Sequence, residues 1–211
     1  MTLETRNQKP ETRRFSCLSD SWPPASDICG GTTLVETIVL IAISTIALLA
    51  LINLFLIFNS IYGYQRAFIA TAGSAGSAIS ALEAAVLPAE RVLALRSFSG
   101  TTYTSTTTSL VLELPAVDAS GNLILGAKDY IAFYVSSTTL YHLIEADAGS
   151  VRLSGVTTLS TTLSSLSFSY DNADFAQVTR VTAEVETSML FKTELIGGAL
   201  RGQWYLRNYS P

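Results

Sequence analysis

The longest apolar run of the chain lies near its N-terminus. Residues 37–58 are interrupted by only a few serine, threonine and asparagine side chains, and no charged residue occurs between Glu36 and Arg66. As an α-helix with a rise of about 1.5 Å per residue, this run would be about 33 Å long. That length is enough to cross the roughly 30 Å hydrocarbon core of a bilayer. The pattern therefore predicts a membrane-spanning helix.

Apolar side chains continue at helical spacing beyond this run. They recur every three or four residues, at Ile61, Tyr64, Phe68, Ala72, Ala75, Ile79, Leu82 and Val86. This period predicts a helix with one apolar face. We expect the small residues 70–78 to pack closely against a sheet, in preference to pairing with another helix. Because Gly73 and Gly76 each weaken a helix by about 1 kcal/mol relative to alanine, a bend or local melting is expected at residues 73–77.

The helical pattern ends near Pro88, which is expected to end or kink the helix. Residues 89–97 are predicted to form a second, short helix. From residue 99 onward the sequence is rich in threonine and serine and alternates with apolar residues, which predicts strands. The predicted strands cover residues 109–114, 123–125 as a short edge, 130–135, 140–145, 167–170, 181–186 and 203–207. Turns are predicted at residues 117–122, 136–139 and 171–174, and a helical turn at residues 159–166.

These patterns predict an α+β chain, in which a long N-terminal helix, transmembrane and then amphipathic, precedes an antiparallel β-sheet domain. Residues 1–31 are polar and contain three prolines, so they are interpreted as an unstructured leader. Residues 32–58 form the membrane-spanning half of the helix, residues 59–97 an exported amphipathic region, and residues 98–211 a β-rich domain. The pair Arg13 and Arg14 in the leader favours a cytoplasmic N-terminus.

Glu36 lies at the start of the apolar run. An ionised carboxylate at the centre of a membrane costs about 2.5 to 3.5 kcal/mol unless another group pairs with it. A positive partner would exist if the chain were cut just before Thr32, because the cut creates a new α-amino group. Glu36 would then be the fifth residue of the mature chain.

Gly31, the string TTLVE at residues 32–36 and the apolar helix that follows resemble the cleavage and methylation signal of type IV pilins and type II secretion pseudopilins. In that family, prepilin peptidase cleaves after the glycine on the cytoplasmic side and methylates the new amine. The glutamate pairs with the amine of a neighbouring subunit during assembly. The resemblance implies that Gly31 precedes the cut, that Thr32 becomes the methylated N-terminus and that Glu36 is the assembly carboxylate.

The sequence departs from the family at the first mature residue, which is usually Phe or Met and here would be Thr32. Cleavage after Gly30 would move Glu36 to the sixth position, so cleavage after Gly31 is expected. An ordinary signal anchor is the alternative interpretation of the same segment.

The predicted layout of a long helix before an antiparallel sheet is also similar to the pilin fold. The sequence WYLRN at residues 204–208 resembles the C-terminal ending of minor pilins and pseudopilins of the PilW-like or J kind. The resemblance implies a single-pass cytoplasmic-membrane protein with its C-terminal domain outside the cytoplasm or in a surface filament. Implied partners are prepilin peptidase, other pilin or pseudopilin subunits, the inner-membrane assembly platform, and membrane lipid before assembly.

Several functions stay open at this point. A pilus, a secretion pseudopilus and a DNA-uptake system would all use such a subunit. A signal-anchored, surface-displayed binding or adhesion domain that is not processed is the alternative. The net charge of −4, from 13 basic and 17 acidic residues, provides no global positive field for nucleic acid. Both cysteines, Cys17 and Cys29, precede the expected cut, so the mature domain would contain no disulfide.

No set of residues in the sequence predicts catalysis, a metal or a cofactor. His142 is the sole histidine and is interpreted as a surface or packed residue. Asp171, Asn172 and Asp174 could offer oxygens to calcium, but they lack the alternating spacing of an EF-hand loop and are better explained as a solvated turn. We expect the threonine-rich residues 101–108 to form a loop, in preference to a glycosylated segment.

Four aromatic residues cluster in the predicted hairpin: Tyr130, Phe133, Tyr134 and Tyr141. Because side chains alternate between the two faces of a strand, at least half of them should be in the core. An exposed ladder of the others would suggest binding of carbohydrate or single-stranded DNA, and without a basic stripe the DNA interpretation is disfavoured.

Overall fold

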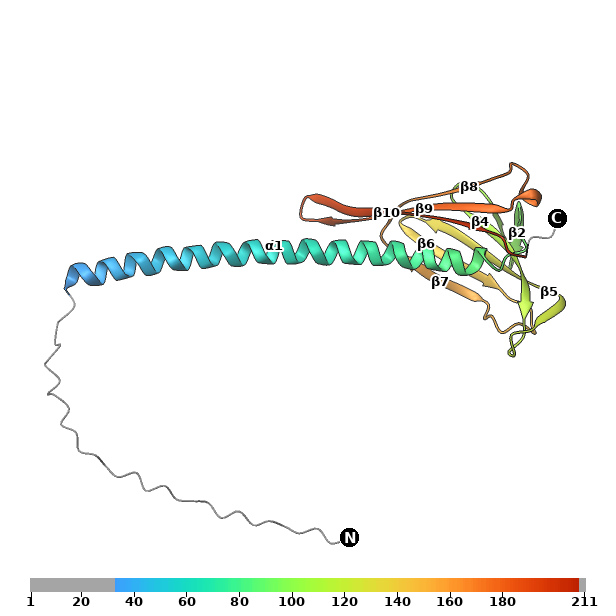
Figure 1. Cartoon of the computed structure of the whole chain (residues 1–211), viewed down its shortest axis with the longest axis horizontal. Helices are drawn as coiled ribbons and strands as arrows, with labels where there is room; N and C mark the ends of the chain where they lie inside the picture. The colour runs from blue at the N-terminus through green and yellow to red at the C-terminus, as the bar shows by residue number, and fades with distance from the viewer. Residues whose placement is uncertain (1–32, 209–211) are drawn as a thin grey trace, which may run out of the picture. The chain divides into compact units, whose positions relative to one another are not determined.

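A computed structural model describes residues 33–208 (Figure 1). The chain divides after Ile52 into two units. The N-terminal unit contributes the first part of helix α1 (Leu34–Val86), and the second unit contains the rest of this helix and the described strands. An α+β architecture with one long apolar helix before antiparallel sheets is therefore confirmed.

The strands form three antiparallel sheets. The five-stranded sheet has the order β1-β4-β5-β6-β7, the three-stranded sheet has the order β10-β9-β8, and β2 pairs with β3. The bounds are β1 Arg91–Val92, β2 Leu95–Phe98, β3 Thr101–Thr104, β4 Leu110–Val117, β5 Leu123–Ser136, β6 Thr139–Glu145, β7 Gly155–Ser160, β8 Leu163–Tyr170, β9 Arg180–Phe191 and β10 Glu194–Tyr205. A short 3₁₀ helix, η1 Phe175–Gln177, precedes β9.

The main core lies where the C-terminal part of α1 meets the inner faces of the two larger sheets. Ala78, Leu82 and Val86 of the helix have no exposed surface. They belong to one apolar cluster with residues of β4, β5, β6, β8, β9 and β10. Alanine at the helix positions that contact the sheets allows a close approach of the backbones, so the expectation of close packing by small residues is confirmed.

A second, smaller cluster covers the opposite face of the five-stranded sheet. The β2–β3 hairpin places Phe98 against Val111 and Ala132. Arg96 of the same hairpin lies 3.6 Å above the ring centroid of Tyr130. The hairpin therefore shields part of the sheet face that the helix does not cover.

Several predicted elements are confirmed. The hairpin of β5 and β6 pairs Tyr130 through Ser136 with Thr139 through Glu145, as the alternation predicted. Residues 118–122 and 171–174 form turns and bends. The helix ends at Val86, two residues before Pro88. In β9, Val181, Ala183 and Val185 are buried in the core.

Other predictions were wrong. Residues 89–97 form β1 and part of β2 instead of a second helix, because Val92 is buried and pairs with Leu112 of β4. Residues 123–125 open the long strand β5, which is central in its sheet. Residues 159–166 contain the end of β7 and the start of β8, and no helical turn. Residues 101–104 form strand β3 paired with β2, so the expected loop is confined to residues 105–109.

The helix also differs from its predicted details. It continues through residues 73–77 without interruption, since the packed sheets compensate for the two glycines. The buried face contains Ala67 and Thr71, whereas Ile61, Tyr64 and Phe68 are 48%, 48% and 49% exposed. The last strand, β10, begins at Glu194, well before the predicted residue 203.

Candidate functional site

The start of α1 is fixed by a threonine cap. The Glu36 amide donates to Thr33 Oγ1 at 3.3 Å, and the Thr37 amide and hydroxyl both donate to the Thr33 carbonyl at 3.1 Å. A threonine followed three residues later by glutamate is the sequence pattern of a helix N-terminus. The cap therefore places Glu36 in the first turn of the helix.

The carboxylate of Glu36 lies on the exposed surface of this first turn. Within residues 33–208 it makes no hydrogen bond or ion pair. The partial positive charge of the helix N-terminus favours a carboxylate there by about 0.3 to 1 kcal/mol. This contribution is smaller than the cost of the same charge at membrane depth, so a cationic partner from outside the described chain would still stabilise it.

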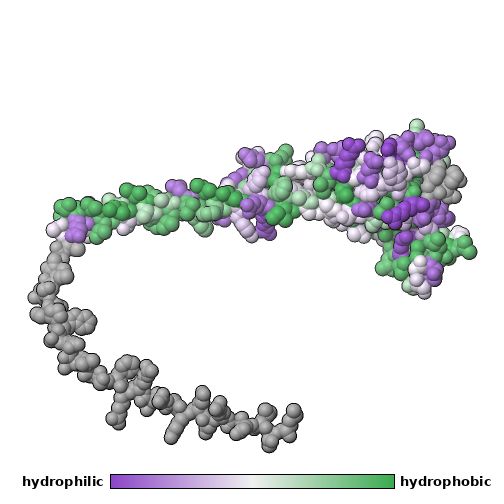
Figure 2. Space-filling view, in the orientation of Figure 1, coloured by the Kyte–Doolittle hydropathy of each residue, from purple (hydrophilic) through white to green (hydrophobic). Residues whose placement is uncertain are grey.

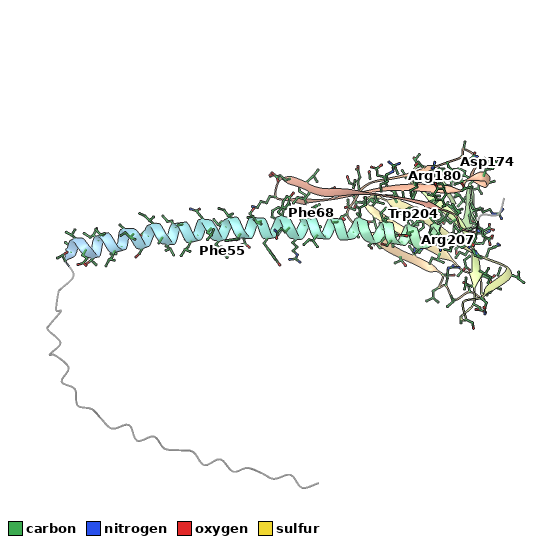
Figure 3. All side chains as sticks on the ribbon, in the orientation of Figure 1. Phe55, Phe68, Asp174, Arg180, Trp204 and Arg207 are labelled. Atoms are coloured by element: carbon green, nitrogen blue, oxygen red, sulfur yellow. The ribbon has the colours of Figure 1, made fainter. Side chains whose placement is uncertain are left out.

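The surface of α1 that follows Glu36 is apolar on every side. Leu34, Ile46 and Phe55 are 78%, 68% and 64% exposed, and Figure 2 shows hydrophobic residues along this part of the helix. Phe55, labelled in Figure 3, projects from a part of the helix that no strand covers. A helix that is apolar all round is buried in a large protein or in a membrane. Since these side chains are not buried by the protein, α1 is a candidate membrane span or signal anchor.

The remaining residues of the predicted processing site, Gly31 and Thr32, lie outside the described residues. Of the three residues of the predicted site, the structure therefore describes Glu36 alone. Sequence reasoning missed the capping role of Thr33, although the spacing of Thr33 and Glu36 is a readable signal for it.

The buried carboxylate of Asp129 holds segments of the β-sheet unit together. Asp129 has no exposed side-chain surface and binds Arg152 Nη1 at 2.5 Å. It also accepts from Ser150 Oγ at 2.7 Å and from the Asp147 amide at 2.8 Å. Arg152 donates further to the Pro115 carbonyl at 2.8 Å. These contacts hold the β6–β7 connection against β5 and β4.

His142 is a packed residue. Its ring stacks on Phe133 with a centroid distance of 4.8 Å and an interplanar angle of 11°. Burial lowers the pKa of the imidazole. No cluster of three or more potential metal ligands occurs among the residues that the structure describes.

The acidic turn before β9 is held by its own backbone. Asp171 accepts from the Thr179 amide, the Thr179 hydroxyl and the Arg180 amide at 3.1, 2.6 and 3.1 Å. Asp174 caps η1 by accepting from the Ala176 amide at 3.0 Å. Partial burial acts to raise the pKa of Asp171, but the hydrogen bonds outweigh it and lower the pKa below its usual value. The interpretation of these aspartates as turn residues is supported.

The clustered aromatic residues divide between the two faces of the sheet. Phe133 is fully buried in the core, while Tyr134 and Tyr141 stack at 5.2 Å on the other face. Tyr103 of β3, which sequence reasoning left in a loop, lies 4.8 Å from the Tyr134 ring. Burial and the Tyr103 hydroxyl raise the pKa of Tyr134.

A groove of about 590 Å³ opens beside this aromatic face. It runs between the β2–β3 hairpin and the edge strand β7. Phe98, Tyr103, Leu143, Glu145 and Val156 contribute to its lining. The groove combines apolar walls with one carboxylate, which is the usual makeup of a small-molecule site.

Comparisons with protein-family models, with curated proteins and with solved structures gave no match to this chain.

Proposed function

We propose that this protein is a prepilin-like subunit, a minor pilin or pseudopilin that is processed and then assembled into a membrane-anchored filament. The observation that supports this most strongly is the start of α1. Glu36 is the sole charge in a helical surface that is apolar on every side, and its carboxylate has no partner among residues 33–208. The folded β-sheet unit at the other end of the helix fits a subunit that presents a domain outside the membrane.

In this proposal prepilin peptidase cuts after Gly31, and Thr32 becomes the methylated N-terminus. The chain first lies in the cytoplasmic membrane with its N-terminus inside and its β-sheet unit outside. The amine of Thr32 in one subunit then pairs with Glu36 of its neighbour. Apolar helices bundle beside one another, so that helix contacts replace lipid contacts around residues 37–58.

The physical reason for the pair is the cost of each charge alone. An unpaired carboxylate or ammonium group in an apolar environment costs several kcal/mol, and pairing offsets much of this cost. The cap by Thr33 keeps the carboxylate in the first helical turn, where a neighbouring chain end can reach it. The β-sheet unit would select the partner subunits and the assembly platform.

Substitution of Glu36 tests this role in a host that has prepilin peptidase and an assembly machine. The readout is the fraction of mature protein in sheared filaments relative to membranes. Glu36→Ala leaves the Thr32 amine of the neighbouring subunit without its proposed partner. An unpaired charge at membrane depth costs about 2.5 to 3.5 kcal/mol, which corresponds to roughly two factors of ten, so incorporation is expected to fall about a hundredfold. Glu83→Ala, which removes an exposed carboxylate of the same helix, is the matched control and should assemble normally. Normal incorporation of Glu36→Ala would refute the proposal.

A second candidate function is ligand binding by a signal-anchored domain. The groove lined by Tyr103 favours it, because a tyrosine ring beside a cavity of about 590 Å³, with the tilted ring of Tyr134 4.8 Å away, offers an amphipathic aromatic surface to a sugar ring. The two functions differ in processing, since a plain anchor needs no cut after Gly31. Glycan-array binding by the full chain in detergent, lost in Tyr103→Ala, would support this second function.

A further inference from the structure

A row of charged and aromatic side chains crosses the face of the five-stranded sheet that the β2–β3 hairpin partly covers. In the strand register, Arg91 of β1 is opposite Glu113 of β4. Glu113 is in turn opposite Tyr130 of β5, and Tyr130 is opposite Glu145 of β6. Because directly opposite residues of neighbouring strands project from the same face, these side chains share one face. The row ends at Glu145, in the lining of the groove between the hairpin and β7.

The two carboxylates of this row are paired differently. Arg91 donates to both oxygens of Glu113, at 3.1 and 3.0 Å. At the other end of the row, Arg96 Nη2 lies 3.6 Å from Glu145 Oε2, which is beyond hydrogen-bond distance. Among residues 33–208, Arg96 Nε and Glu145 Oε2 are buried and have no hydrogen-bond partner. The pair of Arg91 and Glu113 is therefore closed, whereas the pair of Arg96 and Glu145 leaves a donor and an acceptor without partners.

The hairpin holds Arg96 at this position through contacts of its own. The guanidinium group lies 3.6 Å above the ring centroid of Tyr130. The two turn residues, Ser99 and Gly100, have φ angles of 47° and 92°. Positive φ at both central residues gives the tight two-residue turn whose twist matches that of the flanking strands. The hairpin wall of the groove is therefore already in place before any ligand enters, which lowers the cost of binding.

The hairpin side of the groove is aromatic. Phe98 and Tyr103 both line it, and their rings meet edge to face with a centroid distance of 5.6 Å and an interplanar angle of 84°. Tyr103 is supported from behind by Tyr134 at 4.8 Å. Leu143 and Val156 line the groove from β6 and β7. A ligand with one apolar face can pack on this wall while its polar edge reaches the carboxylate.

The unpaired atoms restrict the chemistry of the ligand. A carboxylate only accepts hydrogen bonds and a guanidinium group only donates them, so a single ligand hydroxyl can donate to Glu145 and accept from Arg96. A purely apolar ligand would leave both groups unpaired, which is costly. The opposite charges of Glu145 and Arg96 offset each other, so the site favours a neutral ligand. The groove volume of about 590 Å³ lies within the range of roughly 300 to 1,000 Å³ for small-molecule sites.

We propose that this groove binds a neutral saccharide, with the apolar face of a sugar ring on Phe98 and Tyr103 and a ring hydroxyl between Glu145 and Arg96. The inference rests on the second of the two functions proposed for this protein, ligand binding, and specifies its ligand and its polar contact. It requires neither cleavage after Gly31 nor filament assembly. A basic peptide attracted by Glu145 is the competing occupant, and the experiment distinguishes it from a sugar.

Binding by the uncut full chain tests this proposal. Fluorescent phosphatidylcholine vesicles, which contain no sugar, carry the chain and are applied to an array of neutral and sialylated glycans with immobilised oligolysine beside them. Glu145→Ala removes the acceptor, and Val156→Lys places a long cationic side chain in the groove. Val151→Lys is the matched control, because Val151 does not line the groove and both valines are 56% exposed. Neither lysine substitution therefore disturbs the core.

Vesicles with the unchanged chain are expected to bind neutral glycans. Glu145→Ala and Val156→Lys should each lower binding at least about tenfold, since a hydrogen bond to a charged group corresponds to about a factor of ten or more, and Val151→Lys should bind normally. Absence of binding to every neutral glycan, equal binding by all variants, or a preference for sialylated glycans would overturn the proposal. Binding to oligolysine that is lost in Glu145→Ala would assign the groove to a basic peptide and overturn it too. Because no prepilin peptidase is present, each of these failures leaves the role of Glu36 in assembly unaffected.

Discussion

The two ends of α1 are built from different kinds of apolar residue and have opposite surroundings. The first part carries large aliphatic and aromatic side chains that are exposed, such as Leu49 at 55% and Phe55 at 64%. The last part buries mainly small side chains, including Ala75 at 1% and Ala78 at 0%. Large side chains all round a helix suit contact with lipid or other helices, whereas alanines on one face let sheets approach closely. The surroundings of the helix therefore change along its length together with the size of its side chains.

The largest expected difference in stability is between removal of a buried carboxylate of the β-sheet unit and removal of the exposed carboxylate at the start of α1. Asp129→Ala leaves Arg152 without its partner in the β-sheet unit and is expected to cost about 3 to 5 kcal/mol of unfolding free energy. Denaturant unfolding of the full chain in detergent, followed by fluorescence of the buried Trp204, measures this loss. Glu36→Ala should leave the same transition unchanged, because the Glu36 carboxylate makes no hydrogen bond or ion pair among residues 33–208. A similar loss of unfolding free energy in both variants would contradict the view that Asp129 stabilises the fold and Glu36 does not.

The same leucine-to-alanine change at the two ends of α1 tests the contrast directly. Leu82 is 0% exposed, so Leu82→Ala is expected to cost about 2 to 5 kcal/mol through lost burial and a cavity. Leu49→Ala is expected to leave the unfolding midpoint of the β-sheet unit unchanged. The comparison fails if the two substitutions shift that midpoint equally.

A side chain added at Gly63 tests whether the middle of α1 supports residues 188–197, where β9 and β10 pair only with each other. A valine side chain at position 63 would occupy the space of the Phe191 ring. Gly63→Val is therefore expected to displace residues 188–197 from the helix. It should lower the free energy of unfolding by about 1 to 3 kcal/mol, as overpacking does in other cores. Gly73→Val is the matched control, since no atom lies within 4 Å of a Cβ at position 73. Faster amide exchange in residues 188–197, confined to Gly63→Val, would confirm the expectation.

The smallest expected effect is the pH dependence that His142 contributes. Because burial lowers the pKa of His142, the unfolded chain binds its proton more readily than the folded chain. The contribution to stability is complete above the unfolded pKa of about 6.5 and is lost as the pH falls from there through the folded pKa. Unfolding midpoints measured across this range should fall less steeply in His142→Gln. An unchanged slope would show that other groups control the acid sensitivity.

Much of the fold was readable from local patterns. The apolar run, the helical period up to Val86 and the alternation in β5 and β6 each arise from residues close together in the chain. The cap at Thr33 was readable too, because its glutamate partner lies three residues away. Local preference was sufficient for the extent of these elements, although the buried face of α1 near Ala67 and Thr71 differs from the predicted one.

The wrong predictions share a physical cause, which is pairing between distant segments. Arg91 and Val92 extend as β1 because Glu113 and Leu112 of β4 are opposite them, and the bidentate contact of Arg91 with Glu113 adds to this pairing. The β9–β10 hairpin extends to Lys192 because β10 pairs with all of β9. The partner strands, β4 for β1 and β10 for β9, cannot be identified from the sequence around β1 and β9. The length of the β9–β10 hairpin and its exposed leucines therefore could not be predicted.

The N-terminus of the mature protein tests the central claim most directly. The full chain is expressed with and without a prepilin peptidase, and the first residue is determined by mass spectrometry. The account predicts a product that begins at methylated Thr32, that depends on the peptidase and that is lost in Gly31→Leu. A chain that still begins at Met1 in the presence of an active peptidase would contradict it.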